Sequence, residues 1–141
     1  MRRIANAGPM ELIELERYGV NAQFIKDVAV RIGIPAARVY EMLGAPRSTV
    51  ERRAAEGRDI AGAVGQAAVG MAKLLGKAQA IVDNSKAPRA KGFDVGKWFG
   101  QWIERSVPTL GGRKPIEFVS TPTGRDVLNR LLGAMESGAY Q

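Results

Sequence analysis

The sequence predicts an all-α protein. Apolar residues recur at steps of three and four along most of the 141 residues, which is the spacing of one face of a helix. Almost no segment alternates apolar and polar residues for long enough to form a strand. Glycine, proline and asparagine stand where these periodic segments start and stop. The length permits one or two small domains with a proper core.

Four short helices are expected in the N-terminal part. Their starts carry proline or asparagine, and their ends carry glycine, as helix caps commonly do. They are expected at about Pro9–Tyr18, between the Asn21 cap and Gly33, between Pro35 and Gly44, and at about Arg47–Ala55 before Gly57.

A longer helix is expected from about Ile60 to Asn84. Its apolar residues form one continuous stripe, from Ile60 to Ile81, at alternating steps of four and three. This stripe fits either the core of the chain or the interface of a homodimer. Several glycines in the segment favour close contact with a neighbouring helix. A basic linker follows, from Ser85 to Gly92.

The C-terminal part is predicted to hold three further helical segments. One begins near Val95 and ends near Ser106, and its aromatic face is expected to lie in the core. Two prolines and two glycines then impose a shaped turn from Val107 to Pro115, where a short helix starts. The last helix begins near Thr121 and Pro122 and ends at Gly138. The aromatic residues assigned to the core are Trp98, Phe99, Trp102 and Phe118.

Composition excludes most enzyme chemistry. The chain has no cysteine and no histidine, which removes the usual zinc, haem and iron–sulfur ligands and every Cys/His or Ser/His pair. We therefore expect no catalytic residue, no metal and no cofactor. The net charge of +7 favours an anionic partner, which can be nucleic acid, an acidic protein or an anionic membrane, and charge alone does not choose among them. A signal peptide and a membrane-spanning segment are both missing from the pattern, so we expect a cytoplasmic protein without a membrane partner.

The third and fourth helices match the local pattern of a helix-turn-helix. A tight turn at Gly44 and Ala45 joins them, and in that motif the second helix enters the DNA major groove. The planar guanidinium group of arginine can donate two parallel hydrogen bonds to a phosphate or a guanine, and serine and threonine hydroxyls can bond a phosphate or a base edge. Ser48 with Glu51 also fits a capping box, and a solvated helix is the alternative. The candidate DNA contacts are Arg47, Ser48, Thr49, Arg52 and Arg53.

Two segments resemble the Xre/MbcA/ParS family of bacterial antitoxins, especially the Xre partners of RES-domain toxins. The motif L-G-A-P-R-S-T-V-E-R-R, residues 43–53, is similar to the family's helix-turn-helix segment, with Pro46 in place of a serine and Tyr40 in place of a small residue. From about Val95 onward the chain resembles the toxin-binding domain. The landmarks are Trp102, Pro108, Leu110, Gly112, Pro115, Ile116, Thr121, Gly124, Val127, Leu131 and Gly138.

This resemblance implies an Xre/Cro-like bundle in residues 1–58, a connecting helix and linker in 59–92, and a small helical toxin-binding domain in 93–141. It implies a homodimer that binds operator DNA and blocks the NAD site of a RES-domain toxin encoded by the adjacent gene. RES toxins are related to ADP-ribosyltransferases and consume NAD. The implied toxin contacts are the turn residues Arg113 and Lys114 and the tail Ser137, Gly138, Ala139, Tyr140 and Gln141.

A second interpretation of the sequence remains open. A stand-alone transcription regulator, whose C-terminal domain senses a ligand or only dimerises, has the same helical pattern and charge. Association with a toxin encoded next to it would separate the two interpretations.

Overall fold

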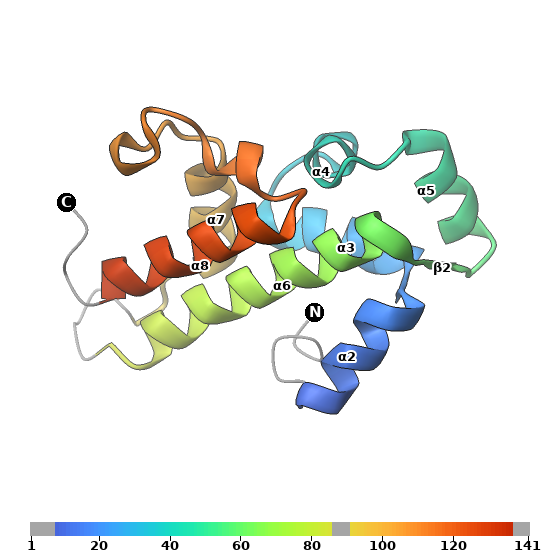
Figure 1. Ribbon diagram of the computed structural model, residues 1–141, viewed down its shortest axis with the longest axis horizontal. Coiled ribbons are helices and arrows are strands. Elements are labelled where there is room, and N and C mark those ends of the chain that lie inside the picture. Colours follow the sequence, from blue (N-terminus) through green and yellow to red (C-terminus); the bar gives the residue numbers. More distant parts are fainter. Residues whose placement is uncertain (1–7, 86–90, 137–141) are drawn as a thin grey trace.

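The computed structural model describes residues 8–85 and 91–136, and it confirms the all-α prediction for them. Figure 1 shows short helices at the N-terminal side, one long central helix and a helical C-terminal part. The α-helices are α2 (Pro9–Tyr18), α3 (Ala22–Ile32), α4 (Ala36–Leu43), α5 (Arg47–Ala55), α6 (Gly62–Asp83), α7 (Val95–Ile103) and α8 (Pro122–Glu136). Two 3-10 turns, η2 (Pro108–Leu110) and η3 (Pro115–Phe118), join α7 to α8.

The N-terminal helices begin and end where the capping residues predict. The Asn21 side chain accepts a hydrogen bond from the backbone N–H of Gln23 at 2.9 Å, which satisfies a donor at the start of α3. Gly33 and Gly44 close α3 and α4 with φ angles of 70° and 73°, in the left-handed region that glycine adopts without strain. Local sequence chemistry therefore sets these helix bounds.

The prediction that the long helix begins at Ile60 is wrong. Ile60 belongs to strand β2 (Asp59–Ile60), which pairs antiparallel with β1 (Val20–Asn21), and α6 starts two residues later. Gly19, with φ 102°, passes directly against the Ile60 backbone, where a Cβ would collide with the carbonyl. The pairing of β1 with β2, which are far apart in the chain, determines where α6 begins. The apolar periodicity within a single segment cannot reveal such a pairing.

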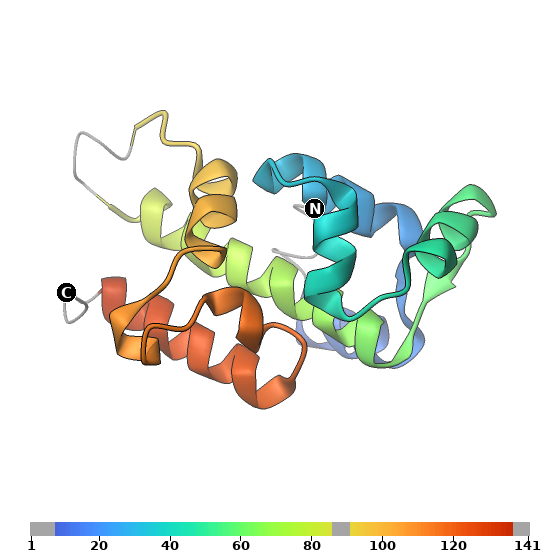
Figure 2. The same ribbon diagram turned by 90° about the horizontal axis from the view of Figure 1, so that it is seen from above.

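Helix α6 is the centre of the core. Helices α2 and α8 pack on it from different sides, and α7 covers a third part (Figures 1 and 2). The middle of the predicted stripe, including Ala67, Met71, Leu74 and Ala78, is buried within the single chain. Of the two alternatives for this stripe, the structure therefore shows an intrachain core. Within the described ranges, no helix is long and apolar enough to span a membrane.

The aromatic prediction is confirmed for Phe99 and Trp102, which are 0% and 2% exposed. Trp98 and Phe118 are half-buried and pack against the same core. Helix α7 packs closely against α3 at Gly100, where a Cβ would collide with the carbonyl oxygen of Ile32. The close approach of these two helices therefore requires glycine at this position.

We expect Gly100→Ala to destabilise the fold by about 1–3 kcal/mol, because the added methyl group forces α7 away from the α3 backbone. Gly133→Ala in α8 is the matched control, since its Cβ meets only the flexible Lys77 side chain at 3.4 Å. That change should leave the free energy of unfolding unaltered or raise it by up to about 1 kcal/mol, because alanine is the better helix former. Urea unfolding of both variants measures the difference.

Candidate functional site

Helix α5 projects at one end of the molecule (Figure 1). Helix α4 ends at Leu43, and the backbone N–H of Ala45 donates to the carbonyl of Tyr40 at 2.8 Å, which closes the turn. Pro46 precedes the first turn of α5 and supplies no side-chain cap. The predicted capping box of Ser48 and Glu51 is therefore wrong. Ser48 lies inside the helix, and Glu51 has other partners.

A three-residue network holds α5 against the helices beneath it. The Tyr40 hydroxyl of α4 donates to one Glu51 carboxylate oxygen at 2.8 Å, and the Lys26 ammonium of α3 donates to the other at 3.2 Å. Burial, and then the bond to Glu51, raises the pKa of Tyr40 to about 12. The bonds from Tyr40 and Lys26 hold the pKa of Glu51 below its ordinary value. This network joins α3, α4 and α5, and its one sign in the sequence is the unusual Tyr40.

The five candidate DNA contacts share α5 but differ in exposure. Arg47 and Ser48 are exposed in its first turn. Arg52 is exposed and stands 4.0 Å from Glu56. Thr49 and Arg53 are half-buried, and an Arg53 guanidinium N–H donates to the Asp59 carbonyl at 2.8 Å. Arg53 therefore ties α5 to strand β2, and the exposed polar surface of α5 is formed by Arg47, Ser48 and Arg52.

A second candidate surface is the turn from Val107 to Pro115. The Val107 N–H donates to the Arg113 carbonyl at 3.0 Å, and the Gly112 N–H donates to the Val107 carbonyl at 3.1 Å. Gly111 and Gly112 have φ angles of 68° and 80°, so the turn depends on two left-handed residues in succession. The predicted shaped turn is confirmed in this form.

Glu117 fixes the two basic residues of this turn. Its carboxylate accepts from an Arg113 guanidinium N–H at 3.3 Å and from the Lys114 backbone N–H at 2.9 Å. The Arg113 side chain is still 68% exposed, and Lys114 is exposed as well. Both cations are therefore presented to solvent from a defined backbone. The predicted tail contacts, Ser137 to Gln141, lie outside the described residues.

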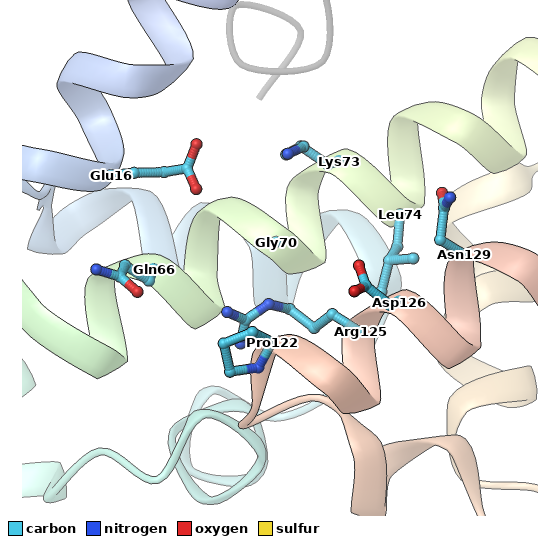
Figure 3. Close-up of a pocket in the computed structure, with 9 residues that line it drawn as sticks. All are labelled: Glu16, Gln66, Gly70, Lys73, Leu74, Pro122, Arg125, Asp126 and Asn129. Atoms are coloured by element: carbon cyan, nitrogen blue, oxygen red, sulfur yellow. The ribbon is translucent and has the colours of Figure 1, made fainter.

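A polar cleft between α2, α6 and α8 has no counterpart in the sequence-based predictions (Figure 3). Arg125 of α8 crosses it beside Gly70, where a Cβ would collide with the arginine side chain. Its guanidinium donates to the Val119 carbonyl at 2.9 Å, and burial lowers its pKa from the ordinary value. Glu16 and Asp126 lie on the same cleft and partly offset that shift. We interpret the cleft as structural, because its most buried cation is already bonded within the chain.

Metal chemistry has no support in the described part of the chain. No three Asp or Glu residues there are grouped so that they could hold an ion.

Comparison with known proteins identifies the class. Residues 77–138 match the family model described as the antitoxin Xre/MbcA/ParS C-terminal toxin-binding domain. This region contains α7, the shaped turn and α8, so the fold carries a toxin-binding domain of an antitoxin.

A curated relative extends the likeness to almost the whole chain. The Prs ADP-ribosylating antitoxin of Sphingobium sp. (strain YBL2) is 27% identical over 139 residues, which cover 99% of this chain and 86% of the relative. The family match and this relative both support an antitoxin of the Xre/MbcA/ParS family, in agreement with the resemblance found in the sequence motifs.

Replacing Tyr40 with phenylalanine tests the network beneath α5. In the folded wild type the pKa of Glu51 is lowered, so its stabilising contribution is present above the ordinary glutamate pKa and is lost as the pH falls through the lowered value. The pKa of Tyr40 is raised to about 12, so its contribution is present below the ordinary tyrosine pKa of 10.0 and is lost as the pH rises toward 12. We expect Tyr40→Phe to weaken the pH dependence of stability at both extremes.

The measurement is urea unfolding at a series of acidic and alkaline pH values. Tyr18→Phe is the matched control, since Tyr18 is 66% exposed. This substitution should leave the loss of stability at acidic and at alkaline pH as in the wild type. A Tyr40→Phe profile identical to the wild-type profile would show that the network does not couple to stability.

Proposed function

We propose that this antitoxin covers the NAD-binding cleft of a cognate RES-domain toxin and represses its own operon through α5. The observation that carries the toxin part is the family match over residues 77–138, which is described as toxin-binding. The words "ADP-ribosylating" in the name of the Sphingobium relative support a toxin of ADP-ribosyltransferase-like chemistry. The proposal divides the chain into a DNA-binding part (1–58), a connection (59–92) and a neutralisation part (93–141).

Neutralisation of this kind requires no catalysis by the antitoxin. A protein surface laid over a substrate cleft excludes NAD by competition. The tail Ser137–Gln141 follows directly on α8, and Tyr140 offers a rigid aromatic anchor of the type that dominates binding energy at interfaces. Arg113 and Lys114 support the contact as exposed cations on a fixed turn.

The DNA part of the proposal is supported by the exposed polar face of α5. Arg47, Ser48 and Arg52 are exposed there, with Thr49 and Arg53 half-buried beside them. The ammonium group of Lys26 pairs with the carboxylate of Glu51, which lies on α5. This pairing reduces the repulsion between Glu51 and a DNA phosphate. As a homodimer, the chain would present two such helices to an operator with two half-sites.

Helix α5 and the turn that carries Arg113 and Lys114 lie at opposite ends of the molecule. In Figures 1 and 2, α5 lies at one end, and the turn between α7 and η3 lies toward the other. A toxin held at one end therefore leaves α5 accessible. Simultaneous binding of DNA and toxin is geometrically possible in this arrangement.

Deleting Ser137–Gln141 tests the occlusion. The deletion removes none of the described helices, so it should leave them intact while restoring NAD consumption by the purified RES-domain neighbour. Tyr140→Ala should reproduce most of this effect, whereas Ser137→Ala should retain inhibition. Unchanged inhibition by the deletion variant would exclude the tail mechanism. Failure of the wild-type proteins to associate would favour a stand-alone regulator.

Replacing Arg47 and Arg52 together with alanine tests operator binding. The double change removes two cations from each subunit of a dimer, so the log–log slope of affinity against salt should become shallower by about 4 if each arginine meets a phosphate. Electrophoretic mobility shift assays over a salt series measure the slope. The matched control is Arg105→Ala with Arg130→Ala, which removes the same charge from exposed positions elsewhere. Operator affinity and slope retained in the α5 variant would contradict the assignment of this helix.

A further inference from the structure

An apolar groove lies where α6, α7 and α8 meet. Ala78, Ile81 and Val82 line it from the last turns of α6, and Phe93 and Trp98 line it from the start of α7 and the residues before it. Leu132 and Met135 complete it from α8. The groove has a volume of about 230 Å³ and opens to solvent. Figure 1 shows the C-terminal ends of α6 and α8 on the same side of the molecule.

The aromatic wall of this groove combines one exposed ring, Phe93, with one ring held by stacking, Trp98. Phe93 is 44% exposed, although most large apolar side chains of the described chain are buried. Trp98 stacks on the buried Trp102, with ring centroids 5.6 Å apart and ring planes inclined by 13°. A side chain that is already held in place loses little conformational entropy when a partner binds. The wall therefore has the properties of a preformed binding surface.

The groove and the toxin-binding domain coincide. The family match begins at residue 77, inside α6, and so includes only the end of that helix. That end contains the three α6 residues of the groove, and the other four lining residues also fall within 77–138. The portion of α6 that belongs to the domain is thus the portion that forms this surface.

We infer that the groove receives a large apolar side chain of the toxin. No charged side chain lines the groove among the described residues, so a polar small molecule would find no partners to orient it. A buried apolar anchor surrounded by a protein interface fits both its chemistry and its size. This inference rests on toxin binding in the proposed function, but it is independent of the tail contact.

Phe93→Glu tests the groove with little risk to the fold, because the side chain is partly exposed. Isothermal titration with the purified RES-domain protein of the adjacent gene should show a Kd weaker by about tenfold or more, the size of effect typical of a central interface residue. Ile13→Glu is the matched control, since Ile13 is 41% exposed on α2, outside the toxin-binding domain. Its Kd should remain within about twofold of the wild type, because a change outside the interface leaves its packing intact.

A second measurement uses the unaltered chain. The sequence has two tryptophans, so 5-fluorotryptophan labelling gives two fluorine resonances. The Trp98 resonance, assigned with Trp98→Phe, should shift when unlabelled toxin is added, and the resonance of buried Trp102 should shift less. This readout decides the question even if Phe93→Glu reduces helicity.

Each alternative result has a distinct meaning. Wild-type affinity in a folded Phe93→Glu variant would overturn the groove while leaving the antitoxin function intact. Absence of any wild-type association would overturn the proposed function and the groove together. If dilution alone shifts the Trp98 resonance, a second copy of the chain occupies the groove. If deleting Ser137–Gln141 shifts it without toxin, the chain's own C-terminal residues occupy the groove. Either result would overturn the inference.

Discussion

Close packing around α6 holds both candidate interaction surfaces in place. This helix is enclosed by α2, α7 and α8, and its small residues allow the neighbours to approach its backbone. Gly65 lies against the Ile60 carbonyl, and Gly70 lies under the Arg125 side chain. Glycine within a helix lowers its intrinsic stability, and the dispersion attraction of closely packed neighbours offsets that loss. The N-terminal and C-terminal parts of the chain thereby share one core.

The two ends of this core use different physical means to present their functional groups. At α5, a buried hydroxyl and an ammonium hold Glu51 and fix the helix that carries the exposed arginines. At the other end, two left-handed glycines and Glu117 fix the turn of Arg113 and Lys114. In both places a carboxylate fixes the backbone that carries the basic side chains: Glu51 anchors α5, and Glu117 anchors the turn. The positive charges are therefore exposed on a defined backbone.

In the proposed mode of binding, the apolar groove adds a second kind of contact to the basic turn. Cations on an exposed turn accelerate encounter and favour an anionic partner, but exposed charges add little to affinity in physiological salt. Burial of an apolar side chain supplies affinity that salt does not screen. A domain with both features can thus recruit a partner electrostatically and retain it by apolar contact.

Local sequence chemistry was enough to predict the helices and the shaped turn, because caps, glycine stops and apolar periodicity act over a few neighbouring residues. The antitoxin family was indicated separately, by the resemblance of two sequence segments to known family motifs. Local sequence chemistry misplaced the start of α6, since Ile60 pairs with Val20 across the intervening helices. It also offered a local capping box as the alternative explanation for Glu51, whereas Tyr40 and Lys26 approach that carboxylate from other helices. The groove was equally out of reach, because its walls come from three helices. These surfaces depend on residues that are distant in the chain, and only tertiary packing brings such residues together.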